Sequence, residues 1–329
     1  MPAKRRLYVH LYVIPICNLK CIHCYYDALP LHASVDDLLS IEQMSQVVRG
    51  LCDTYDAAFD VEGGEFFLRK DISGLFDALT PDYLRYITIT TNGVAKINVD
   101  PALLSCLDEF RVSVEGHTDQ LQRDIRGIKL APVLRTCTRL MTQGVPVTLR
   151  VTLHRKNYHH VQEMLDYFIG LGFSRFSLYE YQASGRGSDY AAEYALDSSA
   201  LEDVLHQLCG RSVAEKTDVF KLSLSPRRIP LIMAFQEELQ EKGYEVVDLS
   251  GAASLTVEYN GVLGVCPWNV VHENIGQFRS ESFLPDIQAM MDVGRLDHAC
   301  QHCSAIRVRR ADNLANAASS AFILGDQAS

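Results

Sequence analysis

The stretch that decides the fold is residues 7–24, LYVHLYVIPICNLKCIHC, in which an apolar run leads directly into three cysteines. The apolar run Leu7–Ile14 has the composition and length of a buried β-strand. Cys17, Cys21 and Cys24 follow at once with the spacing CxxxCxxC. The pattern therefore predicts a metal-binding loop at the end of the first strand.

Strand-like and helix-like segments alternate over the residues that follow. Strands are predicted at 57–61, 86–90, 110–114, 145–153 and 173–179, and helices at 41–51, 72–79, 131–141 and 159–171. Asp100 before Pro101 has the pattern of a helix N-cap followed by proline at the first helical position. Six βα units in about 180 residues predict a parallel sheet with right-handed crossovers. Periodicity alone fits an incomplete barrel as well as an open doubly wound sheet.

The pattern changes near residue 184, where the alternation stops. Two helices are predicted, Ala200–Cys209 and Leu231–Lys242, with no strand between them. A hairpin is predicted from residues 254–259 and 262–266, which flank Asn260-Gly261. We therefore expect four parts: an α/β domain (1–190), a helical bridging segment (191–247), a small third domain (248–310) and a loosely held tail (311–329).

The composition is that of an ordinary folded protein, with 329 residues of which 47% are hydrophobic and 22% charged. A formal net charge of −10 argues against a nucleic-acid partner, which needs a basic face. No segment approaches the roughly 20 apolar residues that span a membrane. The N-terminal apolar run contains His10 and Pro15 and lacks a small-residue cleavage site, so it does not predict a signal peptide. We expect a cytoplasmic protein.

The chain has ten cysteines, and in a reducing compartment clustered cysteines point to metal rather than to disulfides. Cys52, Cys106 and Cys137 each fall within an apolar helical pattern, which predicts small core residues. The three cysteines at 17, 21 and 24 are different. Three thiolates on one loop can hold three irons of a cubane cluster and leave the fourth iron open. The alternative is a zinc site in which His23 supplies a fourth ligand.

The stretch Cys17–Tyr25 resembles the signature of the radical S-adenosylmethionine (SAM) superfamily. The resemblance implies a partial (β/α)6 TIM-like barrel, a [4Fe–4S] cluster on Cys17, Cys21 and Cys24, and SAM bound to the open iron. It further implies reductive cleavage of SAM to a 5′-deoxyadenosyl radical that removes hydrogen from a substrate. His23, just before the third cysteine, stands where the family usually has an aromatic residue beside the adenine.

Three further motifs resemble SAM contacts of the family. Gly63-Gly64-Glu65 is similar to the GGE motif that binds the methionine amino group; glycines let a backbone approach a ligand, and a carboxylate or carbonyl accepts from an ammonium. Ser113 and Glu115 resemble the S-x-D-G segment of the peptide-modifying branch, with Ser113 as a carboxylate or ribose contact and Glu115 in place of Asp. Arg126 resembles the arginine that meets the SAM carboxylate.

A second group of cysteines lies in the last third of the chain. Cys266 follows Gly261 with the spacing Gx4C, and Cys300 and Cys303 form a CxxC. This resembles the auxiliary-cluster region called SPASM, or its shortened twitch form, and implies one auxiliary [4Fe–4S] cluster. Asp248, Cys209 or an open iron position are the alternatives for its fourth ligand. A zinc site with one histidine is the competing interpretation, with the candidates His272, His298 and His302.

The branch that the sequence resembles modifies ribosomally made peptides, sulfatase active-site residues or small sugars, and we expect a ribosomally made peptide that is crosslinked, epimerised or oxidised. The alternatives are a SAM-dependent dehydrogenase of a small molecule such as an aminosugar, and a non-enzymatic iron–sulfur carrier or scaffold. A reductant such as flavodoxin or ferredoxin is implied as partner. Cys209 is a candidate hydrogen donor to a substrate radical, and residues 179–187 are a candidate substrate wall. Arg150, inside a predicted strand, needs a partner for its charge, and SAM and Glu65 are candidates.

Overall fold

The computed structural model describes residues 4–210, 217–248, 252–265, 274–297, 306–310 and 322–323. The first strand, β1 (Arg6–Tyr12), shows how the fold is built. Its odd residues Leu7, Val9 and Leu11 are fully buried, whereas the even residues before Tyr12 are half-buried. Because side chains alternate across a strand, β1 directs one apolar face towards covering helices and a more polar face towards the inside.

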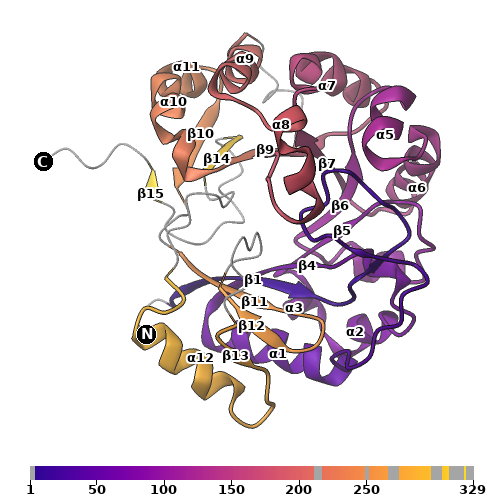
Figure 1. Ribbon diagram of the computed structural model, residues 1–329, viewed down its shortest axis with the longest axis vertical. Helices are drawn as coiled ribbons and strands as arrows, with labels where there is room; N and C mark the ends of the chain where they lie inside the picture. Colours follow the sequence, from indigo (N-terminus) through magenta and orange to yellow (C-terminus); the bar gives the residue numbers. More distant parts are fainter. Residues whose placement is uncertain are drawn as a thin grey trace, which may run out of the picture.

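Parallel strands form the central part of one curved sheet, in the spatial order β11-β1-β4-β5-β6-β7-β8-β9. The six predicted strands are confirmed and the sheet has the form of a partial barrel, which decides between the two folds that periodicity allowed (Figure 1). The bounds of the strands that follow β1 are β4 (Asp56–Glu62), β5 (Ile87–Thr91), β6 (Glu109–Val114), β7 (Val147–Leu153), β8 (Arg175–Glu180) and β9 (Val219–Leu224).

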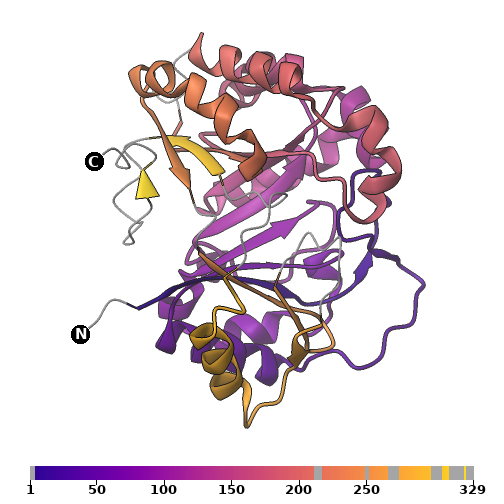
Figure 2. The ribbon, with the colours of Figure 1, turned by 60° about the vertical axis from the view of Figure 1, so that its left-hand side comes forward.

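Helices lie along the outside of the sheet, and Figures 1 and 2 show the same arrangement from two directions. Ser40 forms a capping box with Gln43 at the start of α1, and the predicted N-cap Asp100 accepts a hydrogen bond from the Ala102 amide. The helices are α1 (Ile41–Thr54), α2 (Ser73–Ala78), α3 (Pro81–Leu84), α4 (Pro101–Leu104), α5 (Asp119–Arg126), α6 (Leu130–Thr142), α7 (Val161–Gly170), α8 (Ala191–Tyr194), α9 (Ser198–Cys209), α10 (Ile229–Ala234), α11 (Gln236–Glu241) and α12 (Phe283–Asp292).

The prediction that no strand separates the helices after residue 191 is wrong. β9 lies between α9 and α10 and pairs in parallel with β8, so the barrel sheet continues by one more strand. The predicted helix Leu231–Lys242 is divided into α10 and α11 at Phe235. The segment VFKLSL of β9 is short and follows a helix closely, and only its pairing with β8 identifies it as part of the sheet.

The predicted hairpin is confirmed as β11 (Ala253–Val257) and β12 (Val262–Gly264), which pair antiparallel. β11 also pairs in parallel with β1, so this later segment extends the main sheet at the edge where the chain begins. The remaining strands are β2 (Ile16–Cys17), β3 (Leu29–Pro30), β10 (Tyr244–Asp248), β13 (Gly276–Gln277), β14 (Ile306–Arg310) and β15 (Phe322–Ile323). The division of the chain into four parts stays a prediction.

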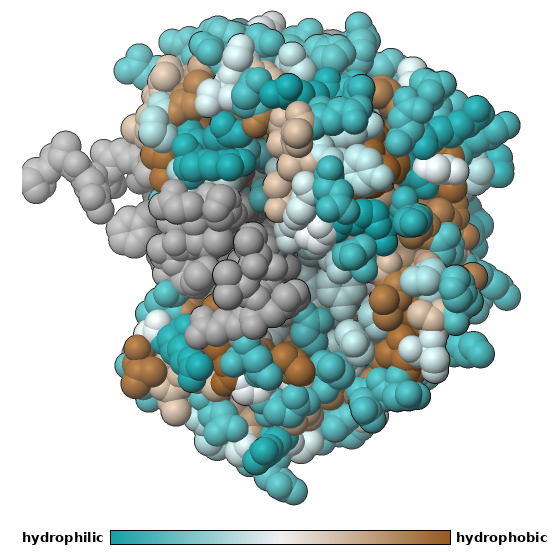
Figure 3. Space-filling view, in the orientation of Figure 1, coloured by the Kyte–Doolittle hydropathy of each residue, from teal (hydrophilic) through white to brown (hydrophobic). Residues whose placement is uncertain are grey.

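The inner face of the curved sheet, here called the lumen, is lined by charged side chains. Arg111 of β6 forms ion pairs with Asp60 of β4 at 2.8 Å and with Glu109 at 2.6 Å. Lys221 of β9 lies 3.1 Å from the same Glu109. The lumen is therefore polar, and the apolar core lies between the strands and the outer helices. On the face seen in Figure 3, most of the coloured surface is hydrophilic.

None of the helices in the described residues combines the length and the hydropathy needed to cross a lipid bilayer. The predicted core positions of three cysteines are confirmed: Cys137 is fully buried, and Cys52 and Cys106 are half-buried against the same core.

Candidate functional site

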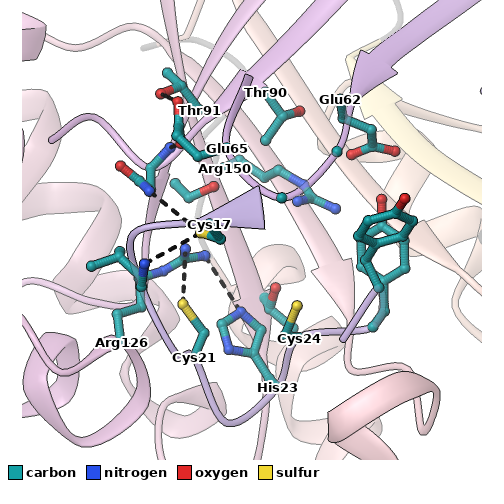
Figure 4. Close-up of a pocket in the computed structure, with 18 of the residues that line it drawn as sticks. Cys17, Cys21, His23, Cys24, Glu62, Glu65, Thr90, Thr91, Arg126 and Arg150 are labelled. Carbon is teal, nitrogen blue, oxygen red and sulfur yellow. Dashed lines mark hydrogen bonds between the residues drawn. The ribbon is translucent and has the colours of Figure 1, made fainter. Parts of the chain in front are cut away.

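A cavity lies where the parallel strands end, and the cysteine motif forms one of its walls (Figure 4). Counting the part open to solvent, its empty space is about 810 Å³. Each strand from β4 to β8 contributes residues at or near its carboxyl end, as is usual for sites in parallel α/β folds. Its lining includes Cys17, Cys21, His23, Cys24, Tyr25, Tyr26, Glu62, Gly63, Gly64, Glu65, Thr90, Thr91, Asn92, Ser113, Arg126, Arg150, Thr152, Tyr179 and Glu180.

The two glycines of the GGE motif hold the cysteine loop, defined here as residues 13–28. The Gly64 amide donates to the Ile14 carbonyl at 2.7 Å, and the Glu65 amide donates to the Ile16 carbonyl at 2.9 Å. A Cβ at Gly63 or Gly64 would lie within 2.3 Å of a carbonyl oxygen of this loop. Glycine is thus needed because two backbone segments approach each other closely here. The sequence alone pointed to the approach of a ligand as the reason for the same glycines and did not reveal this one.

The Glu65 side chain is buried and already saturated with donors. Its carboxylate accepts from Thr91 Oγ1 at 2.6 Å, from the Asn92 amide at 2.8 Å and from the Phe67 amide at 3.2 Å. Burial raises the pKa of Glu65, although these hydrogen bonds oppose the shift. The carboxylate ties the end of β4 to the end of β5, and its contact with a bound ammonium stays a prediction.

Donors converge on two of the three cysteine sulfurs. The Leu19 amide lies 3.4 Å from Cys17 Sγ, Asn92 Nδ2 lies 3.8 Å from the same sulfur, and Arg126 Nη1 lies 3.8 Å from Cys21 Sγ. Burial raises the pKa of Cys17, and it raises that of Cys21 to about 12, so both are thiols until a metal displaces their protons. N–H groups directed at sulfur are what iron–sulfur thiolates receive in proteins, and the donor set fits such a cluster.

In the described residues, no group of three or more His, Cys, Asp or Glu is arranged around one point as ligands of a single ion would be. The zinc alternative for the first motif needs one free nitrogen of the His23 ring, and Nδ1 makes no hydrogen bond to a described residue. His23 Nε2 lies 3.1 Å from Glu115 Oε1 and 3.4 Å from Arg126 Nη2. His23 does line the cavity, as the resemblance implied.

Glu115 anchors a buried polar cluster behind the cysteine loop. Its side chain is fully buried and accepts from Arg126 Nε at 2.7 Å, and His154 Nε2 lies 3.7 Å from its second oxygen. Burial alone would raise the pKa of Glu115, but His23 and Arg126 hold it well below its usual value. Burial lowers the pKa of His23. Glu115 does not line the cavity, so its direct contact with a cofactor is not supported; it orients Arg126, which does line it.

The segment that follows β8 clamps the cysteine loop from outside. Arg186 donates to the Cys21 carbonyl at 3.1 Å and to the Ala28 carbonyl at 3.1 Å, and it lies 2.8 Å from Asp27. Gly185 has a φ of +53°, and a Cβ there would lie 2.2 Å from the Tyr25 carbonyl oxygen. Residues 185–187 therefore support the loop, whereas Tyr179 and Glu180 do face the cavity as the substrate-wall prediction expected.

The remaining predicted site residues lie elsewhere. Cys209 ends α9 and is buried in the apolar core, where burial raises its pKa to about 11, and it does not line the cavity. The hydrogen-donor role of Cys209 stays a prediction. Asp248 is the last residue of β10. Cys266, Cys300 and Cys303, with His272, His298 and His302, lie outside the described residues.

The fold and the site together define a partial α/β barrel with a three-cysteine loop at the carboxyl ends of its strands. Residues 11–168 match the family model described as the Radical SAM superfamily. Residues 11–168 are thus similar to the radical SAM superfamily, whose enzymes use a [4Fe–4S] cluster and SAM.

Several characterised proteins are similar to parts of the chain. AlbA, the antilisterial bacteriocin subtilosin biosynthesis protein of Bacillus subtilis, is 25% identical over 53% of this chain and 39% of its own length. Fe-coproporphyrin III synthase of Methanosarcina barkeri is 28% identical over 54% of this chain and 44% of its own length. A probable GTP 3′,8-cyclase of Sulfurisphaera tokodaii is 25% identical over 64% of this chain and 66% of its own length. The chain thus spans less than two thirds of each relative.

Solved structures share the fold. Streptococcus suis SuiB bound to SAM has a TM-score of 0.66 at 16% identity, covering 87% of this chain and 66% of SuiB. The enzyme anSMEcpe with bound SAM and the Cp18Cys peptide has a TM-score of 0.56 at 17% identity, covering 85% of this chain and 80% of that one. At these identities the likeness shows a common architecture.

Proposed function

We propose that this protein is a radical SAM enzyme that removes a hydrogen atom from a peptide substrate. The observation that carries the proposal is one loop that holds three free thiols beside a strand-end cavity, with N–H donors at two of the sulfurs. When bound, the cluster and SAM supply a 5′-deoxyadenosyl radical, the hydrogen-abstracting species of this family.

The chain's own residues have distinct tasks in this proposal. Cys17, Cys21 and Cys24 hold three irons as thiolates, which leaves the remaining iron for SAM. Arg126, fixed by Glu115, and Ser113, buried on β6, present a guanidinium and a hydroxyl to the cavity for the methionine end of SAM. The half-buried His23 ring covers the loop side of the cavity.

A peptide substrate is supported by the relatives, since AlbA acts in subtilosin biosynthesis and SuiB has been crystallised with the precursor peptide SuiA. A small molecule is the second candidate, supported by the similarity to GTP 3′,8-cyclases and to Fe-coproporphyrin III synthase. The proposed reaction on a peptide is crosslinking, epimerisation or oxidation. The proposal also includes a reductant such as flavodoxin or ferredoxin, and an auxiliary cluster on Cys266, Cys300 and Cys303.

Anaerobic reconstitution tests the core of the proposal. The wild-type chain is loaded with iron and sulfide, and iron is counted; about eight irons indicate two clusters and about four indicate one. Reduction with dithionite in the presence of SAM is expected to release 5′-deoxyadenosine. Cys21→Ala should abolish this release, whereas Cys106→Ala, half-buried against the core and absent from the cavity lining, should not. Retention of zinc in place of iron, without 5′-deoxyadenosine, would refute the assignment.

The two substrate classes are separated by a second measurement. A short open reading frame beside the gene supplies a peptide to incubate with the enzyme, SAM and reductant. A mass change in that peptide supports the peptide assignment. Turnover of a nucleotide or aminosugar, with no peptide modified, supports the small-molecule alternative.

A further inference from the structure

Arg150 is a charged residue of the cavity that has no counter-ion in the described part of the chain. It lies on β7, opposite Ser113 of β6 in the sheet register, and it lines the cavity. Its Nε is buried and makes no hydrogen bond to any described residue. Its guanidinium instead packs on the Tyr179 ring, 4.6 Å from the ring centroid. The residue as a whole is half-buried, and its buried nitrogen leaves a hydrogen-bond donor unused at the cavity, which indicates that a ligand completes this site.

The carboxylates around Arg150 are already engaged. Asp60 pairs with Arg111, Glu62 with His10, and Glu115 with Arg126. Glu65 accepts hydrogen bonds from Thr91 and Asn92. Glu180 pairs with Arg227 and Arg228. The suggestion from sequence that Glu65 pairs with Arg150 is therefore not supported.

The lumen beside the cavity carries charges of both signs. The cations are Arg111, Arg150, Lys221 and Arg307, and the carboxylates are Asp60, Glu62 and Glu109. Burial alone would raise the pKa of Asp60, but Arg111, His10, Arg307 and Arg150 lower it, which shows that these groups act on the same space. An incoming anion would balance the uncompensated cation.

SAM does not supply this balance. It carries a sulfonium and an ammonium against a single carboxylate, so it adds positive charge to the cavity. Arg126 lies with Cys21 and His23 on one side of Cys17, whereas Arg150 lies on the other side with Thr90 and Glu62 (Figure 4). The second guanidinium is thus separate from the one that serves the SAM-binding loop.

We propose that Arg150 binds a carboxylate of the substrate, held for this purpose by its stacking on Tyr179. The proposal rests on the proposed function. The carboxylate belongs to an acidic side chain or to the C-terminus of the peptide substrate, and it lies close to the residue that loses hydrogen. Guanidinium groups bind carboxylates in a planar, paired geometry. A phosphate dianion fits less well, because Glu62, Glu65 and Glu180 also line the cavity and would repel its two charges more strongly than the single charge of a carboxylate.

The test measures binding of two probes, N-acetyl-glutamate amide and N-acetyl-glutamine amide, to the reconstituted full-length chain by saturation-transfer NMR. Wild type should bind the acidic probe about tenfold more tightly than the amide probe, as expected for a charge-assisted hydrogen bond. Arg150→Gln should lose this preference. Arg155→Gln, an exposed arginine paired with Asp197 outside the cavity, should keep it.

Several outcomes would overturn the proposal. One is that wild type binds both probes equally. Another is that inorganic phosphate displaces the acidic probe more strongly than acetate does. A third is that Arg150→Gln binds SAM more weakly but keeps the preference for the acidic probe. Arg150→Met removes the guanidinium and should also lose the preference for the acidic probe; a retained preference would refute the assignment. If wild type fails to cleave SAM, the proposed function fails while probe binding still decides the role of Arg150.

Discussion

Replacing Glu115 by Gln should strongly destabilise the protein even before any cofactor binds. The Glu115 side chain is 0% exposed and that of Arg126 8% exposed, so the substitution leaves a guanidinium buried without its counter-charge. Removing one partner of a buried ion pair generally costs about 3–5 kcal/mol. We expect the lower end, about 3 kcal/mol, because the amide oxygen can still accept from Arg126 Nε.

The assay is urea unfolding of the cluster-free chain, followed by circular dichroism. Glu163→Gln is the matched control, since Glu163 is 65% exposed and pairs with His160 at the surface; its loss should stay below about 0.5 kcal/mol. Glu115→Asp keeps the charge and should retain more stability than Glu115→Gln. A loss in Glu115→Gln no larger than that in Glu163→Gln would refute the ion-pair argument.

The same variant has a defined pH dependence. The pKa of Glu115 in the folded chain lies well below its usual 4.5, so its contribution is complete above that value and is lost as the pH falls below it. The pKa of His23 is lowered from 6.5, which also favours the folded state at higher pH. The stability difference between wild type and Glu115→Gln should therefore shrink on acidification below about pH 4.5. A difference that grows with acidification would contradict this sign.

Three other substitutions test the cysteine loop and its surroundings. Gly64→Ala places a Cβ 2.2 Å from the Ile16 carbonyl oxygen and should prevent iron loading, measured by absorbance and iron content, whereas Gly170→Ala has open space at its Cβ and should load normally. Arg186→Gln should release iron to a chelator several times faster than wild type, because two carbonyls and Asp27 lose their donor; unchanged release would show that the clamp is dispensable. Cys209→Ala should leave 5′-deoxyadenosine formation and product unchanged and should lower stability by about 1–2 kcal/mol, as a buried core truncation does; loss of product with SAM cleavage intact would support the hydrogen-donor hypothesis.

Local patterns were sufficient to predict the six strands of the first 180 residues, the helices between them other than α3 and α5, and the three-cysteine loop after β1. Hydrophobic periodicity and ligand spacing are written in neighbouring residues, so both can be read without coordinates. The same holds for the Asp100 cap and for the β11–β12 hairpin, whose turn residues are adjacent in the chain.

Other features depend on residues that meet only in the folded chain. β9 became a barrel strand because β8 lies beside it, and β11 joined the sheet because β1 offers an open parallel edge. The glycine pair at 63–64 and Arg186 are explained by backbone carbonyls far away in sequence. Glu65 and Glu115 belong to family-like motifs, yet only Glu65 lines the cavity, whereas Glu115 lies behind the cysteine loop and pairs with Arg126.

Sequence by itself thus determined the class of chemistry, because a metal-ligand spacing is a local property of one loop. Tertiary structure decided which charges are compensated, because an ion pair depends on distance in space and on burial. For that reason the first cluster was predictable from eight consecutive residues, Cys17–Cys24, while the unpaired Arg150 emerged only when its neighbouring carboxylates were found with other partners.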